Sequence, residues 1–190
     1  RLFSYLVRLV GVASLVNAFL PSSPSHRPKY VLYADKKDRC DVAVFGGGFG
    51  GLYTALAISR EARAKGRKLD VALVVPSDQF VFLPLLYDLT MGTASEAEVC
   101  PYYRDMLAGT GVRQVKASLD CFASPDLYSA NLTTATTQEA CTLSFRASVV
   151  AVGATPESIL ASVPGASQYV QPFYTQENAQ ETRALLTRLE

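Results

Sequence analysis

Three consecutive segments carry the hydrophobic patterns of a strand, a helix and a second strand. Residues 41–45 form a short apolar run, as in a parallel strand that is buried on both faces. Residues 52–65 place apolar side chains on one helical face and most charges away from it, and Gly66 is suited to end this helix. Residues 69–75 are apolar again and stop at Pro76. This order predicts a βαβ unit with parallel strands.

The pattern after Pro76 is less regular. Residues 80–87 are apolar and aromatic, but Pro84 excludes a regular central strand there. Residues 122–146 alternate loosely and are rich in Ser and Thr, which is typical of a β-hairpin or a small meander. Four further elements are expected: a helix over 101–108, a strand over 112–119, a strand over 148–152 and a helix over 177–189. Together these segments predict an α/β, Rossmann-like fold whose parallel sheet carries a β-meander insertion.

Composition and charge support a globular chain. Of 190 residues, 49% are hydrophobic and 18% are charged, which is enough apolar material for a packed core. The net charge is +1, yet residues 1–40 contain seven Lys/Arg and two Asp, so the remainder is negative. Because the globular part has no basic excess, nucleic acid is not expected as a partner.

Reactive residues are sparse. The four cysteines, Cys40, Cys100, Cys121 and Cys141, form no Cys-x-x-Cys pair, so neither a zinc site nor a redox dithiol is expected. His26 is the only histidine and lies in a segment rich in Pro and Ser, which argues against a Ser-His-Asp triad. We therefore predict no metal ligand and no catalytic acid, base or nucleophile.

Residues 1–38 have the composition of a targeting leader. Arg8 interrupts the apolar run over residues 2–20 and leaves an uninterrupted segment that is too short to span a membrane. Val16-Asn17-Ala18 followed by Phe19 is a small-residue cleavage pattern. The basic, hydroxylated residues that follow make this leader resemble the two-part presequence of proteins sent to complex plastids. A secretory leader, a mitochondrial leader or a membrane anchor are the alternatives. Residues 39–190 are expected to form the folded, dinucleotide-binding domain.

The stretch between the first strand and the first helix fits a dinucleotide-binding loop. Only one register of Gly-x-Gly-x-x-Gly places all three glycines, at Gly46, Gly48 and Gly51. The first permits the tight turn, the second lets a pyrophosphate approach the backbone, and the third permits close packing of helix on strand. Phe49 and Gly50 lie within the same turn, where helix N–H groups are available to phosphates. We predict that all five residues contact the cofactor.

The second strand ends with a departure from the usual pattern. A carboxylate normally stands there to accept hydrogen bonds from the ribose hydroxyls, and this chain has Val75. Either Asp78, with Ser77 beside it, replaces that ligand, or binding is weakened by the loss of a charge-assisted hydrogen bond of about 1.5–3 kcal/mol.

The chain resembles a known family over residues 41–190. The matching segments are 42–56, 73–89, 106–113, 149–154 and 163–175, and Phe-Leu-Pro-Leu-Leu-Tyr is the most specific sequence among them. They are similar to the N-terminal half of the type II NAD(P)H dehydrogenases, in particular the plant and algal plastid C-type form. The resemblance implies FAD at the glycine-rich loop, Pro84 and Leu85 beside the isoalloxazine, and Gly153 at a second flavin-contacting strand.

The resemblance also implies a reaction. Members of this family transfer hydride from NAD(P)H to FAD and then reduce a quinone. No second Gly-x-Gly-x-x-Gly occurs over residues 154–190, so the chain is interpreted as the flavin half of a longer enzyme. For the full-length protein we expect a quinone acceptor, a membrane surface, location in a plastid or else a mitochondrion, and leave a homodimer open. The alternative is a truncated or degenerate copy that serves as a non-catalytic structural or interaction subunit.

Overall fold

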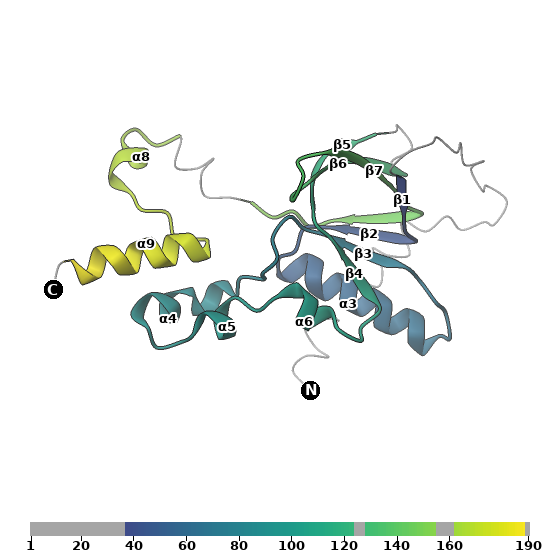
Figure 1. Cartoon of the computed structure of the whole chain (residues 1–190), viewed down its shortest axis with the longest axis horizontal. Coiled ribbons are helices and arrows are strands. Elements are labelled where there is room, and N and C mark those ends of the chain that lie inside the picture. Colours follow the sequence, from purple (N-terminus) through teal and green to yellow (C-terminus); the bar gives the residue numbers. More distant parts are fainter. Residues whose placement is uncertain (1–36, 124–127, 155–161, 189–190) are drawn as a thin grey trace.

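The computed structural model describes residues 37–123, 128–154 and 162–188, and a parallel sheet lies at its centre (Figure 1). Its four strands are ordered β4-β3-β2-β8, and each neighbouring pair is parallel. The strands are β2 (Val42–Phe45), β3 (Val71–Val74), β4 (Val112–Val115) and β8 (Ala147–Val150). The predicted α/β class with a parallel sheet is therefore confirmed.

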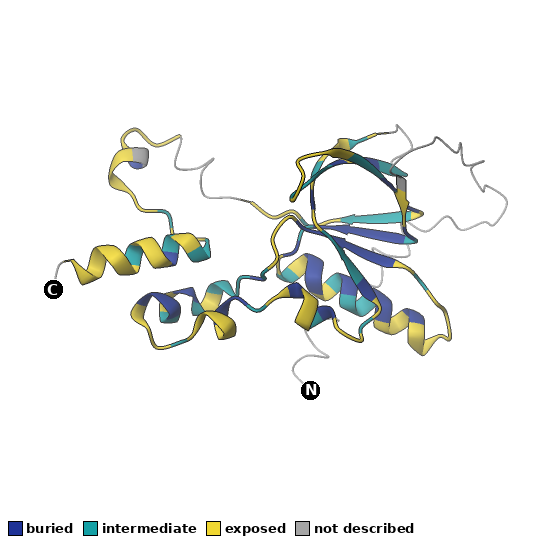
Figure 2. Cartoon of the chain, viewed as in Figure 1, coloured by how far each residue is buried: buried dark blue, intermediate teal, exposed yellow. Residues whose placement is uncertain are grey.

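Helix α3 (Phe49–Ala64) covers one face of this sheet, as its buried stripe in Figure 2 shows. Leu52 is fully buried and shares a hydrophobic cluster with Val44 of β2, because both strand and helix must hide their apolar faces. The helix starts earlier than the sequence pattern predicts, since the Leu52 N–H already donates to the Gly48 carbonyl oxygen at 2.9 Å. The predicted βαβ unit is confirmed.

A second sheet packs on the other face of the parallel sheet. Its order is β1-β7-β6-β5, with antiparallel pairs except for β1 beside β7. The strands are β1 (Lys37–Arg39), β5 (Ala117–Phe122), β6 (Ser129–Thr134) and β7 (Ala140–Ser144). Phe45 lies between the sheets, with ring centroids 5.6 Å from Phe122 and 5.7 Å from Phe145. The predicted meander is thus one wall of a second hydrophobic core.

One strand boundary differs from the sequence prediction. The single strand expected over 112–119 is two strands, because the chain leaves the parallel sheet at Lys116 and enters the meander at Ala117. Hydrophobic pattern cannot show such a change of sheet, since both strands bury apolar side chains. The first strand that the structure describes, β1, begins at Lys37. The predicted leader otherwise lies outside the described residues.

Short helices fill the connection between β3 and β4 and the end of the chain. They are η1 (Leu83–Leu85), α4 (Leu86–Met91), α5 (Glu96–Val99), α6 (Tyr103–Leu107), α8 (Ala166–Tyr169) and α9 (Gln176–Thr187). The segment around Pro84 is indeed no strand. Helices α4 and α9 pack together, and Ala179 is fully buried in a third cluster with Leu86. Within the described residues, no helix is both long and apolar enough to cross a membrane.

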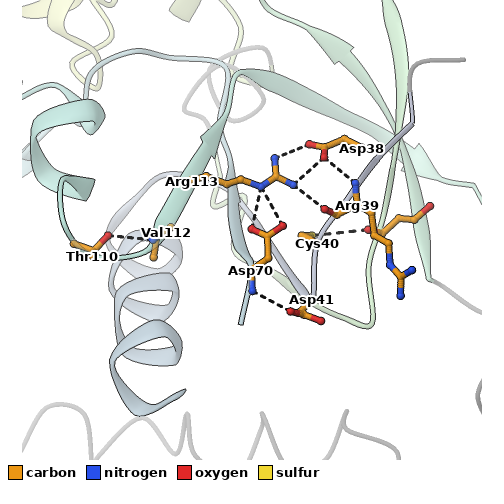
Figure 3. A network of polar contacts seen from close by, with 9 residues as sticks. Asp38, Arg39, Cys40, Asp41, Asp70, Thr110, Val112 and Arg113 are labelled. Carbon is orange, nitrogen blue, oxygen red and sulfur yellow. Dashed lines mark hydrogen bonds and ion pairs between the residues drawn. The ribbon is translucent and has the colours of Figure 1, made fainter. Parts of the chain in front are cut away.

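The amino ends of β2, β3 and β4 are tied together by charged groups (Figure 3). The Arg113 guanidinium donates to both Asp38 carboxylate oxygens, at 2.6 and 3.0 Å, and to an Asp70 oxygen at 3.0 Å. The Asp70 backbone N–H donates in turn to the Asp41 carboxylate at 2.9 Å. Cys40 lies among them, and its burial raises the thiol pKa to about 12. This network joins the edge of the parallel sheet to β1 of the second sheet.

Candidate functional site

The glycine loop, residues 46–51, lies at the carboxyl end of β2, where ligands bind in open parallel sheets. Gly46 has φ +105°, and a Cβ there would lie 2.2 Å from the Ala151 carbonyl oxygen. A Cβ at Gly51 would lie 1.8 Å from the Gly46 carbonyl oxygen. A Cβ at Gly48, by contrast, would have no heavy atom within 4 Å. Gly46 and Gly51 are therefore required by packing, whereas Gly48 leaves an open approach to the backbone.

A cleft of about 430 Å³ opens beside this loop, within the size range of small-molecule sites. Gly47 and Gly48 form one wall, and side chains between Val75 and Leu83 form much of another. Residues 174–177, at the start of α9, close a third side. The first N–H groups of α3 have no partner inside their own helix, so they can donate to an anion in the cleft.

Tyr103 and Val75 hold Gly47 from two sides. The Tyr103 hydroxyl donates a hydrogen bond of 2.7 Å to the Gly47 carbonyl oxygen, and only 3% of this tyrosine is exposed. Burial raises the pKa of the Tyr103 phenol to about 12, so the hydroxyl keeps its proton at neutral pH. A Cβ at Gly47 would lie 2.2 Å from that hydroxyl oxygen and 2.6 Å from Val75 Cγ2. The sequence contains no local signal that pairs Tyr103 with the loop.

The end of β3 offers the cleft no carboxylate. Val75 is 6% exposed and lines the cleft, together with Ser77, whose hydroxyl donates to the Gln79 carbonyl oxygen at 2.8 Å. The Asp78 carboxylate instead forms an ion pair with Lys116, and Asp78 is not among the residues that line the cleft. Among the residues described, the only charged lining residue is Glu177 of α9. The arrangement fits a pyrophosphate at the loop but lacks the usual ribose ligand at β3.

The other predicted cofactor residues are not among the residues that line the cleft. The Phe49 ring makes edge contacts with Phe80 and Phe82, at centroid distances of 5.1 and 5.2 Å. Gly50 is in the first turn of α3. Pro84 and Leu85 belong to η1, directly after the lining residue Leu83, and Gly153 follows β8 with φ +71°. The structure thus brings Gly48 and Ser77 into one cleft.

Metal-ligating side chains and cysteine thiols are the other candidates for chemistry in the described part of the chain. There, no group of three or more His, Cys, Asp and Glu side chains is placed to hold a metal ion. The described chain holds four cysteines as thiols: Cys40 and Cys100 are buried, Cys121 is exposed, and Cys141 is intermediate.

The fold and the cleft define a dinucleotide-binding protein of the α/β class. The chain belongs to the pyridine nucleotide-disulphide oxidoreductase family, whose sequence profile matches residues 40–188. This membership agrees with the glycine loop at the β2–α3 junction, although no cysteine pair of the dithiol type occurs in the sequence.

Two curated proteins are similar in sequence to this chain. The chain is 36% identical over 170 residues to the alternative NAD(P)H-ubiquinone oxidoreductase C1, chloroplastic/mitochondrial, of Arabidopsis thaliana, which covers 86% of the chain and 32% of that protein. It is 30% identical over 151 residues to the demethylphylloquinone reductase NdbB of Synechocystis, covering 78% of the chain and 36% of that protein. The chain thus spans about a third of the length of these relatives. The predicted resemblance to the type II NAD(P)H dehydrogenases is confirmed.

The solved structures show the same fold. NDH2 from Plasmodium falciparum, determined in complex with NADH, superimposes with a TM-score of 0.62 at 22% identity. That match covers 81% of the chain and 30% of the NDH2 chain. The Rossmann-like architecture expected from the sequence is confirmed by this similarity.

Proposed function

We propose that this chain is the FAD-binding part of an NAD(P)H:quinone oxidoreductase. The observation that carries the proposal is the open face of Gly48 on a cleft at the carboxyl end of a parallel sheet. The names of both curated relatives, a ubiquinone oxidoreductase and a phylloquinone-type reductase, support a quinone as acceptor. FAD, when bound, supplies the hydride-accepting and electron-transferring chemistry, and the protein supplies binding and orientation.

Within this proposal the loop residues bind the pyrophosphate. The free N–H groups at the start of α3 donate to the phosphate oxygens, and the partial positive charge of the helix terminus adds to the attraction. Gly48 gives the phosphates access, while Phe49 and Gly50 contribute backbone N–H groups. Ser77 adds a polar side chain to the cleft. Asp78 could serve as a ribose ligand only by leaving Lys116.

Three residues outside the cleft lining are proposed to orient the flavin. Pro84 and Leu85 in η1 follow Leu83, which lines the cleft, and they are proposed to lie against the isoalloxazine. Gly153, after β8, is proposed to let the backbone approach the flavin from the other side. None of these residues supplies a proton donor or base, so the proposal assigns no catalytic residue to the described chain.

The remaining parts of the proposed reaction concern the whole protein. NAD(P)H is proposed to bind through a further nucleotide domain, and a quinone at a membrane surface to accept the electrons. By the name of its Arabidopsis relative, which is chloroplastic/mitochondrial, we place the protein in a plastid or a mitochondrion, and we favour the plastid on the leader sequence. A homodimer is compatible with this proposal.

A second function is favoured by one observation. Val75 is buried where a ribose carboxylate is expected, and Asp78 is engaged by Lys116. A degenerate copy that keeps the fold without the flavin, and that serves as a structural or interaction subunit, would tolerate both features.

The visible spectrum separates the two functions. The protein is produced from its natural open reading frame and purified without added flavin. The enzyme hypothesis predicts the two absorption bands of oxidised FAD. In the absence of oxygen, NADH or NADPH should bleach these bands, and a soluble quinone should then restore them. A colourless, well-folded protein that binds no added FAD would leave only the structural function.

A further inference from the structure

Tyr103 links two parts of the chain that lie far apart in sequence. It is the first residue of α6, and its hydroxyl reaches the Gly47 carbonyl oxygen, 56 positions earlier, at 2.7 Å. The Tyr103 backbone N–H donates to the Asp78 carbonyl oxygen at 2.9 Å, and its ring makes an edge contact with Phe80 at 6.3 Å. Its side chain is therefore fixed at both ends, with the hydroxyl against the glycine loop.

This contact explains a glycine outside the motif. Gly47 occupies a variable position of Gly-x-Gly-x-x-Gly, yet a Cβ there would collide with both Tyr103 and Val75. The Gly47 Cα therefore lies in a narrow slot between a tyrosine hydroxyl and a valine methyl. No other residue type would fit without displacing one of these buried side chains.

The hydrogen bond from Tyr103 to Gly47 fixes the direction of the next backbone donor, the Gly48 N–H. The carbonyl of Gly47 and the N–H of Gly48 belong to one planar trans peptide, so they point in opposite directions. When the hydroxyl of Tyr103 holds the carbonyl, the Gly48 N–H is turned away from Tyr103 and cannot rotate. The hydroxyl also offsets the negative end of a carbonyl dipole that would otherwise lie free beside the cleft.

We propose that Tyr103 is a positioning residue for the cofactor pyrophosphate, acting through the Gly47–Gly48 peptide. The inference rests on the proposed binding of FAD and names a residue that prepares the loop for it. Preorganisation matters here because a loop that is already ordered loses less entropy on binding. With Val75 in place of a ribose carboxylate, the phosphate contacts carry a larger share of the affinity.

The test compares two tyrosine variants of the protein expressed from its natural reading frame. Tyr103→Phe keeps the ring and removes the donor, while Tyr102→Phe alters the neighbouring exposed tyrosine, which is not in the cleft lining. The dissociation constants of FAD and of riboflavin, which lacks the pyrophosphate, are measured on the flavin-free proteins by fluorescence quenching. We expect Tyr103→Phe to weaken FAD binding about tenfold, as for the loss of one buried hydrogen bond.

Riboflavin distinguishes positioning from general damage. A positioning role lowers the preference for FAD over riboflavin in Tyr103→Phe and leaves it unchanged in Tyr102→Phe. If Tyr103→Phe weakens both ligands equally, or neither, Tyr103 has only a structural role. If the unaltered protein itself binds no FAD, the proposed function is wrong, and this inference falls with it.

Folding is checked on the same samples by circular dichroism and by the thermal midpoint without flavin. Should Tyr103→Phe fail to fold, 4-fluorophenylalanine at position 103 fills the space of the hydroxyl without providing a donor. An unchanged preference for FAD in that protein would overturn the inference.

Discussion

The two ends of the parallel sheet are built on opposite principles. At the amino end, Arg113 joins the carboxylates of Asp38 and Asp70, so charged side chains hold strands and sheets together. At the carboxyl end the glycine loop carries a single side chain, that of Phe49, and Gly47 and Gly48 line a cleft. Side chains therefore stabilise the amino end, whereas the proposed recognition of the cofactor at the carboxyl end depends on exposed backbone. The comparison predicts that substitutions at the two ends affect different measurements.

Within the glycine loop we expect the largest contrast between two alanine variants. Gly51→Ala places a Cβ 1.8 Å from the Gly46 carbonyl oxygen, so it should lower the free energy of unfolding by at least about 3 kcal/mol or prevent folding. Gly48→Ala meets no neighbouring atom and should fold with a nearly unchanged midpoint, yet lose FAD because the methyl group occupies the phosphate approach. Denaturant titration and flavin content measure the two effects.

The result that contradicts this prediction is specific to each variant. Gly51→Ala that folds like the unaltered protein would show that α3 can move away from β2. Gly48→Ala that retains FAD would place the pyrophosphate elsewhere than at Gly48.

At the amino end, Arg113→Met should destabilise the fold without touching the cleft. The Arg113 side chain is about one-third exposed, and its guanidinium makes charge-assisted bonds to two carboxylates, so we expect a loss of about 1–3 kcal/mol in urea unfolding. Asp38 and Asp70 would then face each other uncompensated. The FAD dissociation constant should not change.

Arg104→Met is the matched control for Arg113. Arg104 pairs with Asp105 at 3.6 Å, and both side chains are largely exposed, so the change in unfolding free energy should stay below about 1 kcal/mol. Equal effects of the two arginine variants would mean that the network at the amino end is no stronger than a surface ion pair.

Val75→Asp tests the missing ribose ligand. A carboxylate at this position should strengthen FAD binding about tenfold, because it can accept a charge-assisted hydrogen bond from a ribose hydroxyl. The flavin-free protein should become less stable, since Val75 is buried and the charge has no partner there. Val75→Asn introduces a side chain with the shape of Asp but without its charge, and it should give little or no gain in FAD affinity. If both variants bind FAD as tightly as the unaltered protein does, the ribose lies away from Val75.

At neutral pH the smallest effect is expected from Cys40, because its proton influences stability only at alkaline pH. Burial raises its folded pKa to about 12, above the ordinary value of 9.0. The folded state therefore holds this proton more tightly, so its contribution to stability is complete below pH 9 and is lost as the pH rises from about 9 toward 12. Cys40→Ala should flatten the fall in unfolding free energy above pH 9, whereas replacing exposed Cys121 should not. Identical slopes would exclude Cys40 as the cause.

Much of the fold could be predicted from local pattern. The run before Gly46 and the stripe after Gly51 identify β2 and α3, because a buried parallel strand and an amphipathic helix have different periods. The glycine spacing identified the loop, and the proline at position 84 correctly excluded a strand. The division of the stretch 112–119 between two sheets was missed, since both halves look equally apolar.

The sequence by itself determined the βαβ unit, the position of the glycine loop and the absence of an acidic residue at Val75, because each depends on residues close together in the chain. Only the tertiary structure decided that Tyr103 supports the loop through Gly47, that Lys116 engages Asp78, and that the start of α9 closes the cleft. Such contacts join segments that the chain brings together only by packing the connection after β3 and the last helix against the sheet. No periodicity in the sequence records which side chains will meet there.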